Sequence, residues 1–276
     1  MTVRRVLLLL CLALCAAALV GCGGDALSFD PVASAANTTV ASQSERVSFT
    51  ATMNVDGVGG MAFSGAGIFD GRTRSGALNM RFTMPADVQA QLGGADPTMQ
   101  MIMDGSDGLV MYMRSPLFRT LPSDKWVKLD MEKLAKKEGI DLSSVFDAGQ
   151  ADPSQSLHML MASTDAHPIG YDRVRGVFTT HYTLNVDLGR LAKGSAALRK
   201  TFEMLRKLTG VQSFPAEAWI DKQGRVRRMK IDMSFNTPTG AFTMSMTEDL
   251  YAFGVKVNVR PPDASQVLDA SALLGG

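Results

Sequence analysis

The chain of 276 residues is poor in the residue types that carry most enzyme chemistry. It has three histidines and three cysteines, and all of the cysteines lie within the first 22 residues. A disulfide framework in the rest of the chain is therefore excluded. The histidines show no metal-ligand spacing. Among them, His181 is expected to lie on the polar face of a strand as a structural residue, because no carboxylate partner is evident near it.

Catalytic motifs are also missing. The sequence has no Gly-x-Ser-x-Gly and no Ser-x-x-Lys motif, and the stretch from Gly189 to Ser195 has the glycine spacing of a phosphate loop without its lysine. We therefore expect no enzymatic activity, no cofactor and no bound metal.

Charge of one sign is not in excess. The 28 Lys and Arg residues are matched by 27 Asp and Glu residues, and 46% of the chain is apolar. This balance excludes a disordered polar chain and a protein that binds nucleic acid through bulk charge. One local basic group is interpreted either as a solvated outer face or as a surface that steers the domain to anionic headgroups. It comprises Lys222, Arg225, Arg227, Arg228 and Lys230.

The longest apolar run lies at the amino terminus. Arg4 and Arg5 precede an uncharged stretch from Val6 to Val20, which is too short to span a membrane and is typical of a secretory signal. The stretch ends in Leu19-Val20-Gly21-Cys22, which resembles a bacterial lipobox, where the cysteine thiol receives a diacylglyceryl group. We expect cleavage before Cys22 and anchoring at the extracytoplasmic face of the cell membrane through acyl chains on Cys22.

Three parts of the chain follow from this pattern. Residues 1–21 are the predicted lipoprotein signal peptide, residues 22–44 a predicted flexible tether, and residues 45–276 a predicted lipid-binding domain. The tether is expected because its segment is rich in Gly, Ala, Ser, Asn and Thr and has no hydrophobic period.

Strict alternation of apolar and polar residues dominates the predicted domain. Apolar side chains occupy every second position from Val47 to Val55, from Leu78 to Met84 and from Met229 to Phe235. A period of two predicts strands with one buried and one solvated face. Turn signals such as Asp56-Gly57 and Pro238-Thr239-Gly240 separate the strands and favour antiparallel hairpins.

Helical patterns are few. Amphipathic helices are predicted after Pro153-Ser154 and after Ser195, with shorter ones from Met131 to Lys137 and from Leu142 to Phe146. We infer an α+β, mainly β fold. It is a strongly curved antiparallel sheet of about 9 to 11 strands, a half-open barrel, that encloses a few helices.

Methionine is abundant, at 18 residues, and most of it falls on the predicted inner face of the sheet, including Met61, Met84 and Met229. Strands favour β-branched and aromatic residues, whereas methionine is unbranched and fills irregular space. We therefore predict a hydrophobic cavity between the sheet and the helices that receives lipid acyl chains. Its predicted lining is Met53, Met80, Phe82, Met99, Met101, Met103, Met111, Met113, Leu184, Ile231, Met233, Met244 and Met246.

Two alternatives stay open on the sequence alone. In the first, the methionines pack the closed core of a structural or sensor lipoprotein that binds no lipid. In the second, thioethers on neighbouring strands bind a soft metal such as Cu(I). The lack of cysteine after Cys22 argues against the second alternative.

Three further segments resemble parts of a known family. The first runs from Val174 to Tyr182 and closes in Val186-Asp187-Leu188. The second runs from Phe214 to Met229, and the third is Asp152-Pro153 with Leu157 and Leu160. The first resembles the central strand motif of lipoproteins of the LppX/LprG type. The second is similar to the hairpin that follows this motif, and the third to the helix that precedes it.

The resemblance implies the fold of the LolA/LolB lipoprotein carriers, a half-open antiparallel barrel around helices with an apolar cavity. It also implies that the protein carries lipids or lipidated molecules in the cell envelope without catalysis. We therefore expect a monomeric, membrane-anchored lipoprotein whose partners are a lipid or lipidated molecule and the membrane itself.

Overall fold

The computed structural model describes residues 30–133 and 155–270, apart from gaps at 58, 92, 119–121, 123, 195–202, 204–205, 208 and 238–239. One compact unit begins at Pro31. The predicted signal peptide, Cys22 and the helix expected from Leu142 to Phe146 lie outside the described residues. Of the helix expected after Ser195, the described residues 203, 206, 207 and 209 are helical.

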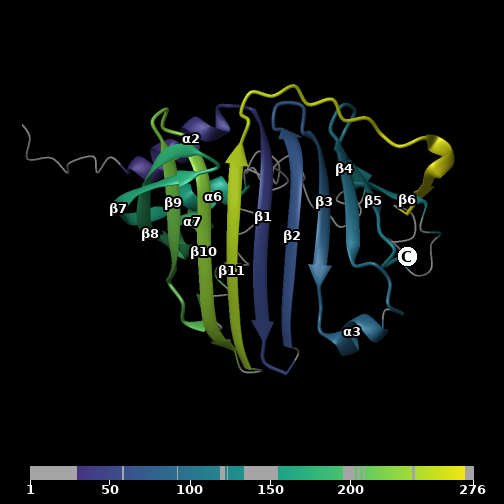
Figure 1. Cartoon of the computed structure of the whole chain (residues 1–276), viewed down its shortest axis with the longest axis horizontal. Coiled ribbons are helices and arrows are strands. Elements are labelled where there is room, and N and C mark those ends of the chain that lie inside the picture. Colours follow the sequence, from purple (N-terminus) through teal and green to yellow (C-terminus); the bar gives the residue numbers. More distant parts are fainter. Residues whose placement is uncertain are drawn as a thin grey trace, which may run out of the picture. The chain divides into compact units, whose positions relative to one another are not determined.

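In the described part of the chain, twelve strands form one sheet (Figure 1). They lie in the order β12-β6-β5-β4-β3-β2-β1-β11-β10-β9-β8-β7. All neighbours are antiparallel except β12 and β6, which are parallel. The strands are β1 (Ser44–Val55), β2 (Gly59–Asp70), β3 (Ser75–Thr83), β4 (Thr98–Asp104), β5 (Val110–Arg114), β6 (Trp126–Asp130), β7 (Ser163–Val174), β8 (Val177–Asp187), β9 (Ser213–Asp221), β10 (Val226–Thr237), β11 (Gly240–Tyr251) and β12 (Val267–Asp269).

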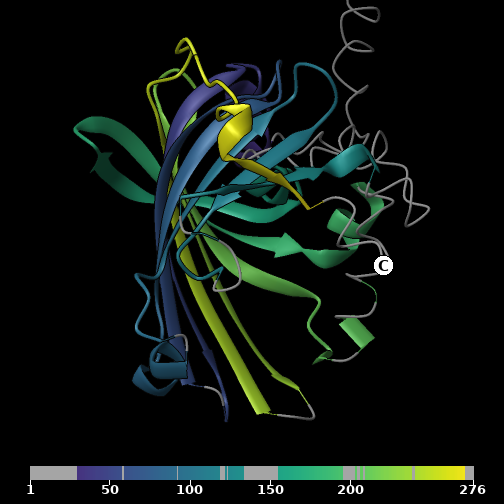
Figure 2. The same ribbon diagram turned by 90° about the vertical axis from the view of Figure 1, so that its right-hand side faces the viewer.

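The predicted curved, mainly β architecture is confirmed. The sheet curves without closing, and β7 and β12 form its two edges (Figure 2). The sheet has twelve strands, where the sequence predicted about 9 to 11. One reason is that β7 does not show a regular alternation of apolar and polar residues. Two irregularities, between Thr164 and His167 and between Pro168 and Gly170, shift its register against β8 and break the period of two.

The register also confirms the predicted one-faced alternation. Directly paired residues on antiparallel strands point to the same face. In β1, Val47 pairs with Leu250, Ala51 with Met246 and Met53 with Met244. The apolar rows of neighbouring strands therefore lie on one face, here called the inner face.

Helix α2 (Pro31–Val40) corrects the prediction that residues 22–44 form a flexible tether. The helix buries Val32, Ala35, Ala36 and Thr39, at a spacing of three to four residues. Alanine and threonine make up most of this stripe, so its hydrophobic signal is weak in the sequence although its small side chains allow close packing. Only residues 22–30 keep the role of a predicted tether.

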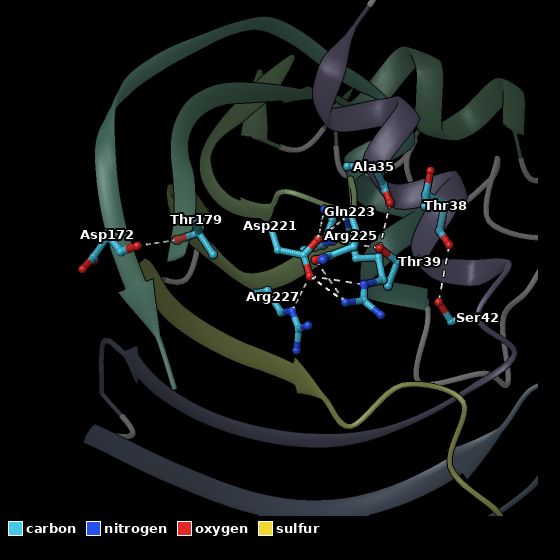
Figure 3. A network of polar contacts seen from close by, with 11 residues as sticks. Ala35, Thr38, Thr39, Ser42, Asp172, Thr179, Asp221, Gln223, Arg225 and Arg227 are labelled. Atoms are coloured by element: carbon cyan, nitrogen blue, oxygen red, sulfur yellow. Dashed lines mark hydrogen bonds and ion pairs between the residues drawn. The ribbon is translucent and has the colours of Figure 1, made fainter. Parts of the chain in front are cut away.

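A buried hydroxyl fastens α2 to the sheet. The Thr39 hydroxyl donates a hydrogen bond to the carbonyl oxygen of Ala35, at 2.7 Å, and accepts one from the backbone N–H of Val226, at 2.8 Å (Figure 3). Thr39 therefore joins the helix to the first residue of β10. Because α2 packs on the sheet through this contact, the folded unit begins at Pro31, the first residue of the helix.

Three of the four described α-helices cover one end of the sheet, and the fourth, α3 (Ala86–Gln91), follows β3 at the other side and buries none of its residues. Helices α2, α6 (Gln155–Met161) and α7 (Leu188–Gly194) pack against β7 to β10. Helix α6 confirms the helix predicted after Pro153-Ser154, and residues 131–133 are helical as expected. In contrast, every residue of β4 is only partly buried. The inner face is thus tightly packed at β8 to β10 and looser toward β4.

The carboxyl-terminal segment forms a strap along one end of the sheet. After β11 the chain runs past the ends of β1 to β5 and returns through the short 3-10 helix Ala264–Gln266 to β12 (Figure 1). The Ser44 hydroxyl donates to the carbonyl oxygen of Val255 at 2.8 Å, and Lys125 Nζ donates to that of Ser265 at 2.8 Å. The strap therefore connects the middle of the sheet to its β6 edge.

Candidate functional site

A row of four methionines crosses the inner face near the β1–β2 and β10–β11 turns. Met61 on β2 pairs with Met53 on β1, Met53 pairs with Met244 on β11, and Met244 pairs with Met233 on β10. The four side chains are partly buried. Four neighbouring strands therefore present the same flexible, unbranched side chain at the same level.

A cavity of about 680 Å³ lies over this row. We call it the methionine cavity. The other apolar side chains around it come from α7, from the segment before β9, and from β9 and β10. Its apolar lining is Met53, Met61, Met233, Met244, Leu188, Val211, Phe214 and Phe235. This volume lies in the range of small-molecule binding pockets.

Polar groups border the methionine cavity on the strand ends. Asp232 is one of them. Burial alone would raise the pKa of the Asp232 carboxyl, but hydrogen bonds from Ser245 and Lys230 outweigh burial and lower that pKa. Lys230 Nζ lies 2.9 Å from the Asp232 carboxylate. Because Lys230 and Asp232 alternate with Ile231 and Met233 along β10, this ion pair lies on the outer face, behind the methionine row.

A second, smaller cavity lies between β1 and β4. Its volume is about 210 Å³, and Met101, Met103, Leu78 and Phe49 line it. Glu248 also lines it, with only 6% of its surface exposed. This Glu248 cavity thus combines apolar walls with one carboxyl group.

Glycines let two phenylalanine rings that line the Glu248 cavity lie close to the sheet. A Cβ atom at Gly76 would come within 2.7 Å of the Phe69 ring, and one at Gly65 within 2.6 Å of the Phe49 ring. The rings therefore occupy the space of the missing side chains, and glycine at alternate positions of β2 was the sequence signal for this close approach.

The structure distributes the predicted lining residues over several places. Met53, Met233 and Met244 line the methionine cavity, and Met101 and Met103 line the Glu248 cavity. Met80 and Met99 border a hollow of about 860 Å³ with mainly polar walls. Phe82, Met111 and Met113 are partly buried, Met246 packs against the core, and Leu184 and Ile231 are buried within it. The structure also adds Leu188, Val211, Phe214 and Phe235, which the sequence analysis had not selected.

The arrangement required by the copper alternative is present in the register. Met101 lies opposite Met113, and Met103 lies opposite Met111. Among the described residues, no group of three or more His, Cys, Asp or Glu side chains is placed to hold a metal ion. The Cu(I) alternative therefore stays a hypothesis that depends on thioethers.

The expectation that no carboxylate lies near His181 is wrong. His181 Nε2 lies 2.7 Å from a carboxylate oxygen of Glu217, and its ring stacks on Trp219 with centroids 4.0 Å apart. Residue His181 pairs with Trp219, and Thr183 pairs with Glu217, so the contact is diagonal across β8 and β9. The pair was not predicted because its two residues are 36 positions apart in the sequence. It lies on the face opposite the methionine cavity.

Carboxylates neutralise most of the basic group of the β9–β10 hairpin. Asp221 accepts hydrogen bonds from the guanidinium groups of Arg225 and Arg227, and Asp249 accepts two from Arg228. Lys230 pairs with Glu217 and Asp232. A structural role for this group on the outer face is therefore favoured over headgroup steering.

No helix in the described ranges is long and apolar enough to cross a membrane. Cys22, the predicted lipid attachment site, lies outside those ranges, and its role stays a prediction.

Comparison with known proteins gives no established function. No protein-family model matches the chain. An uncharacterised 31.2 kDa protein of Streptomyces griseus, encoded between rplA and rplJ, is 29% identical over 244 residues. The match spans 86% of this chain and 77% of that protein.

Solved structures of the predicted type are among the matches. LprF from Mycobacterium bovis matches 84% of this chain and 95% of its own, with a TM-score of 0.49 and 14% identity. The lipoprotein LppX from Mycobacterium tuberculosis matches 84% of this chain and 100% of its own, with a TM-score of 0.44 and 14% identity. A LolA-superfamily protein from Nitrosomonas europaea covers 83% of this chain with a TM-score of 0.30 and 8% identity. At these identities the resemblance gives no ligand and no residue roles.

Proposed function

We propose that this protein is a membrane-anchored lipoprotein of the cell envelope that binds lipid acyl chains in the methionine cavity and carries or presents them. The observation that carries the proposal is the row Met61, Met53, Met244 and Met233 beneath a cavity of about 680 Å³. A closed, dry core is the alternative that this cavity disfavours.

The chemistry of the lining suits a hydrocarbon chain. Burying one methylene group is worth about 0.8 kcal/mol, so a long acyl chain gains several kcal/mol even after the cost of ordering it. Methionine side chains adapt to differently shaped apolar ligands because they have three rotatable bonds and no branch. The cavity therefore fits a class of acyl chains better than one rigid molecule.

Native mass spectrometry tests this proposal directly. The chain from residue 22 onward, with Cys22→Ser to remove the anchor, is purified from its own host and sprayed without detergent. We expect a bound acylated molecule. Met244→Gln, which places an amide in the middle of the row, is expected to weaken binding of a fluorescent acyl probe by about tenfold.

The matched control is Met101→Gln, which makes the same change in the Glu248 cavity. It is expected to leave probe affinity within about twofold of the unsubstituted chain. Loss of binding in Met101→Gln alone would move the ligand to the Glu248 cavity and contradict the proposed site. Absence of both co-purified lipid and probe binding would contradict the lipid-binding function itself.

A further inference from the structure

Exposed apolar side chains gather on one hairpin of the sheet. In the described ranges, Ile169 (57% exposed), Tyr171 (73%) and Phe178 (54%) are three of the four large hydrophobic residues that are well exposed. The fourth, Leu268, is 37% exposed and lies on β12. We call Ile169, Tyr171 and Phe178 the hairpin patch. Contiguous exposed apolar groups of this kind mark interaction sites.

The patch is ordered and prominent. The rings of Tyr171 and Phe178 stack with centroids 5.4 Å apart and planes 24° from parallel. They lie on the β7–β8 hairpin, which projects past the sheet on the side away from α6 and α7 (Figure 2). The hairpin therefore presents a flat pair of rings at a protruding part of the unit.

The turn of this hairpin is fastened to the middle of the sheet. Arg175 and Gly176 both have positive φ angles, 48° and 81°, as a tight two-residue hairpin turn requires. The Arg175 guanidinium donates to Asp249 at 3.1 Å and to Ser48, and it lies 4.0 Å from the ring centroid of Tyr251. These contacts hold the hairpin against β1 and β11. Because the hairpin is already held in place, little further conformational entropy is lost when the patch binds a partner.

The charges of the hairpin favour an apolar interface. Within residues 165–178, which hold the hairpin patch, Asp165 and Asp172 balance Arg173 and Arg175, and Arg175 is already paired with Asp249. Arg173 donates to the carbonyl oxygen of Gly176 at 3.0 Å, within the turn. No net charge is left to select an acidic or basic protein partner, whereas Tyr and Phe together suit the boundary between lipid headgroups and acyl chains.

The position of the hairpin along the chain favours a membrane as its occupant. Helix α2 packs against β7. The segment from the predicted anchor Cys22 to Asp30 spans roughly 30 Å at full extension. The start of α2 therefore stays within roughly 30 Å of the bilayer surface when Cys22 is anchored. Because α2 packs against β7, the β7–β8 hairpin is held close to the membrane as well.

We propose that the hairpin patch docks in the headgroup region of the membrane that carries the anchor. Tyr171 and Phe178 bury their rings there, and Arg175 holds the hairpin in the docking position. This surface is distinct from the methionine cavity, so docking does not depend on what the cavity binds. Docking adds a second contact to the acyl anchor and fixes the orientation of the domain.

Vesicle binding of the anchor-free chain tests the proposal. The chain from residue 22 with Cys22→Ser is mixed with vesicles of phosphatidylcholine, with or without phosphatidylglycerol, and sedimented. We expect binding that Tyr171→Ser with Phe178→Ser weakens by at least about tenfold. Because residues 165–178 of the hairpin have no net formal charge, phosphatidylglycerol is expected to change binding by less than about twofold.

Leu268→Ser is the matched control, because it removes an exposed apolar side chain outside the hairpin. It is expected to bind vesicles like the unsubstituted chain. All variants are expected to retain binding of the acyl probe, which separates a failure of docking from a failure of the proposed lipid-binding function. Equal sedimentation of the double variant, or no binding by the unsubstituted chain, would overturn the proposal.

A single-residue reporter gives an independent reading. Trp126 and Trp219 are buried, with 7% and 6% of their surfaces exposed, so Tyr171→Trp adds one exposed indole to a constant background. We expect its emission to shift to shorter wavelength with vesicles present. An unchanged emission, or self-association of the chain that the double variant abolishes, would identify the patch as something other than a membrane contact.

Discussion

Replacing Asp221 with alanine is expected to lower the free energy of unfolding by about 3 kcal/mol. The Asp221 side chain is fully buried and lies 3.0 Å from Arg225 and 2.7 Å from Arg227. It also accepts hydrogen bonds from the backbone N–H groups of Gln223 and Arg225, at 2.9 and 3.0 Å. The substitution leaves two guanidinium groups and two backbone donors of the β9–β10 turn without this acceptor.

Urea unfolding of the anchor-free chain measures this loss. Asp96→Ala serves as the control, since Asp96 pairs with Arg81 at 3.1 Å while both side chains are more than half exposed. An exposed pair of this kind contributes at most about 1 kcal/mol. If the two substitutions lowered the free energy of unfolding equally, the buried Asp221 cluster would contribute no more to stability than an exposed ion pair.

The pH dependence of stability follows from the same residue. Burial alone would raise the pKa of Asp221, but hydrogen bonds from the Arg225 backbone and from the Arg227 and Arg225 side chains outweigh it and lower this pKa. The folded protein therefore binds fewer protons at this site than the unfolded chain does. Stability from Asp221 is fully present above its ordinary pKa of 3.8 and is lost as the pH falls through the lower folded value. The stability difference from Asp221→Asn should shrink below about pH 4.

Replacing Ala36 with aspartate is expected to destabilise the folded unit by about 3 kcal/mol or more, because it buries an unpaired carboxylate. Ala36 is 0% exposed and belongs to the same core cluster as Leu157, Leu160 and Val226. The substitution also adds volume to a contact made by small side chains. The midpoint and slope of urea unfolding give the size of the loss.

Asn37→Asp is the control for the helix, since residue 37 is exposed on α2. It introduces the same carboxylate one position further along and is expected to change stability by less than about 0.5 kcal/mol. If Ala36→Asp were equally harmless, residues 31–40 would behave as the tether that the sequence predicted, and docking of α2 would be contradicted.

The sheet was predictable wherever residues alternate without interruption. In β1, β3, β10 and β11 the period of two indicated both the strand and its inner face, as the pairing of Met53 with Met244 shows. Strand β7 was not recognised because Pro168 and two register shifts break its period. Helix α2 was missed because large apolar residues are what make a helical stripe visible in a sequence, and the buried stripe of α2 consists of valine, alanine and threonine.

The candidate site was predictable in kind but not in extent. Alternation shows which methionines share a face, yet cavity boundaries depend on which helices cover that face. Leu184 and Ile231 follow the same pattern as Met53, but α2, α6 and α7 bury them. Phe214 and Val211 line the methionine cavity from a segment far from its strands in sequence, and no local pattern indicates such a contact.

The pairing of β1 with β11 has a consequence for biogenesis. These strands join the two halves of the sheet, and Arg46 pairs with Tyr251, so the central seam needs nearly the whole polypeptide. Pairing over such a separation is slow, because a long loop must close first. The two halves of the sheet therefore cannot join until β11 has been synthesised, which leaves time for a predicted export signal to engage a translocation channel before the complete sheet forms.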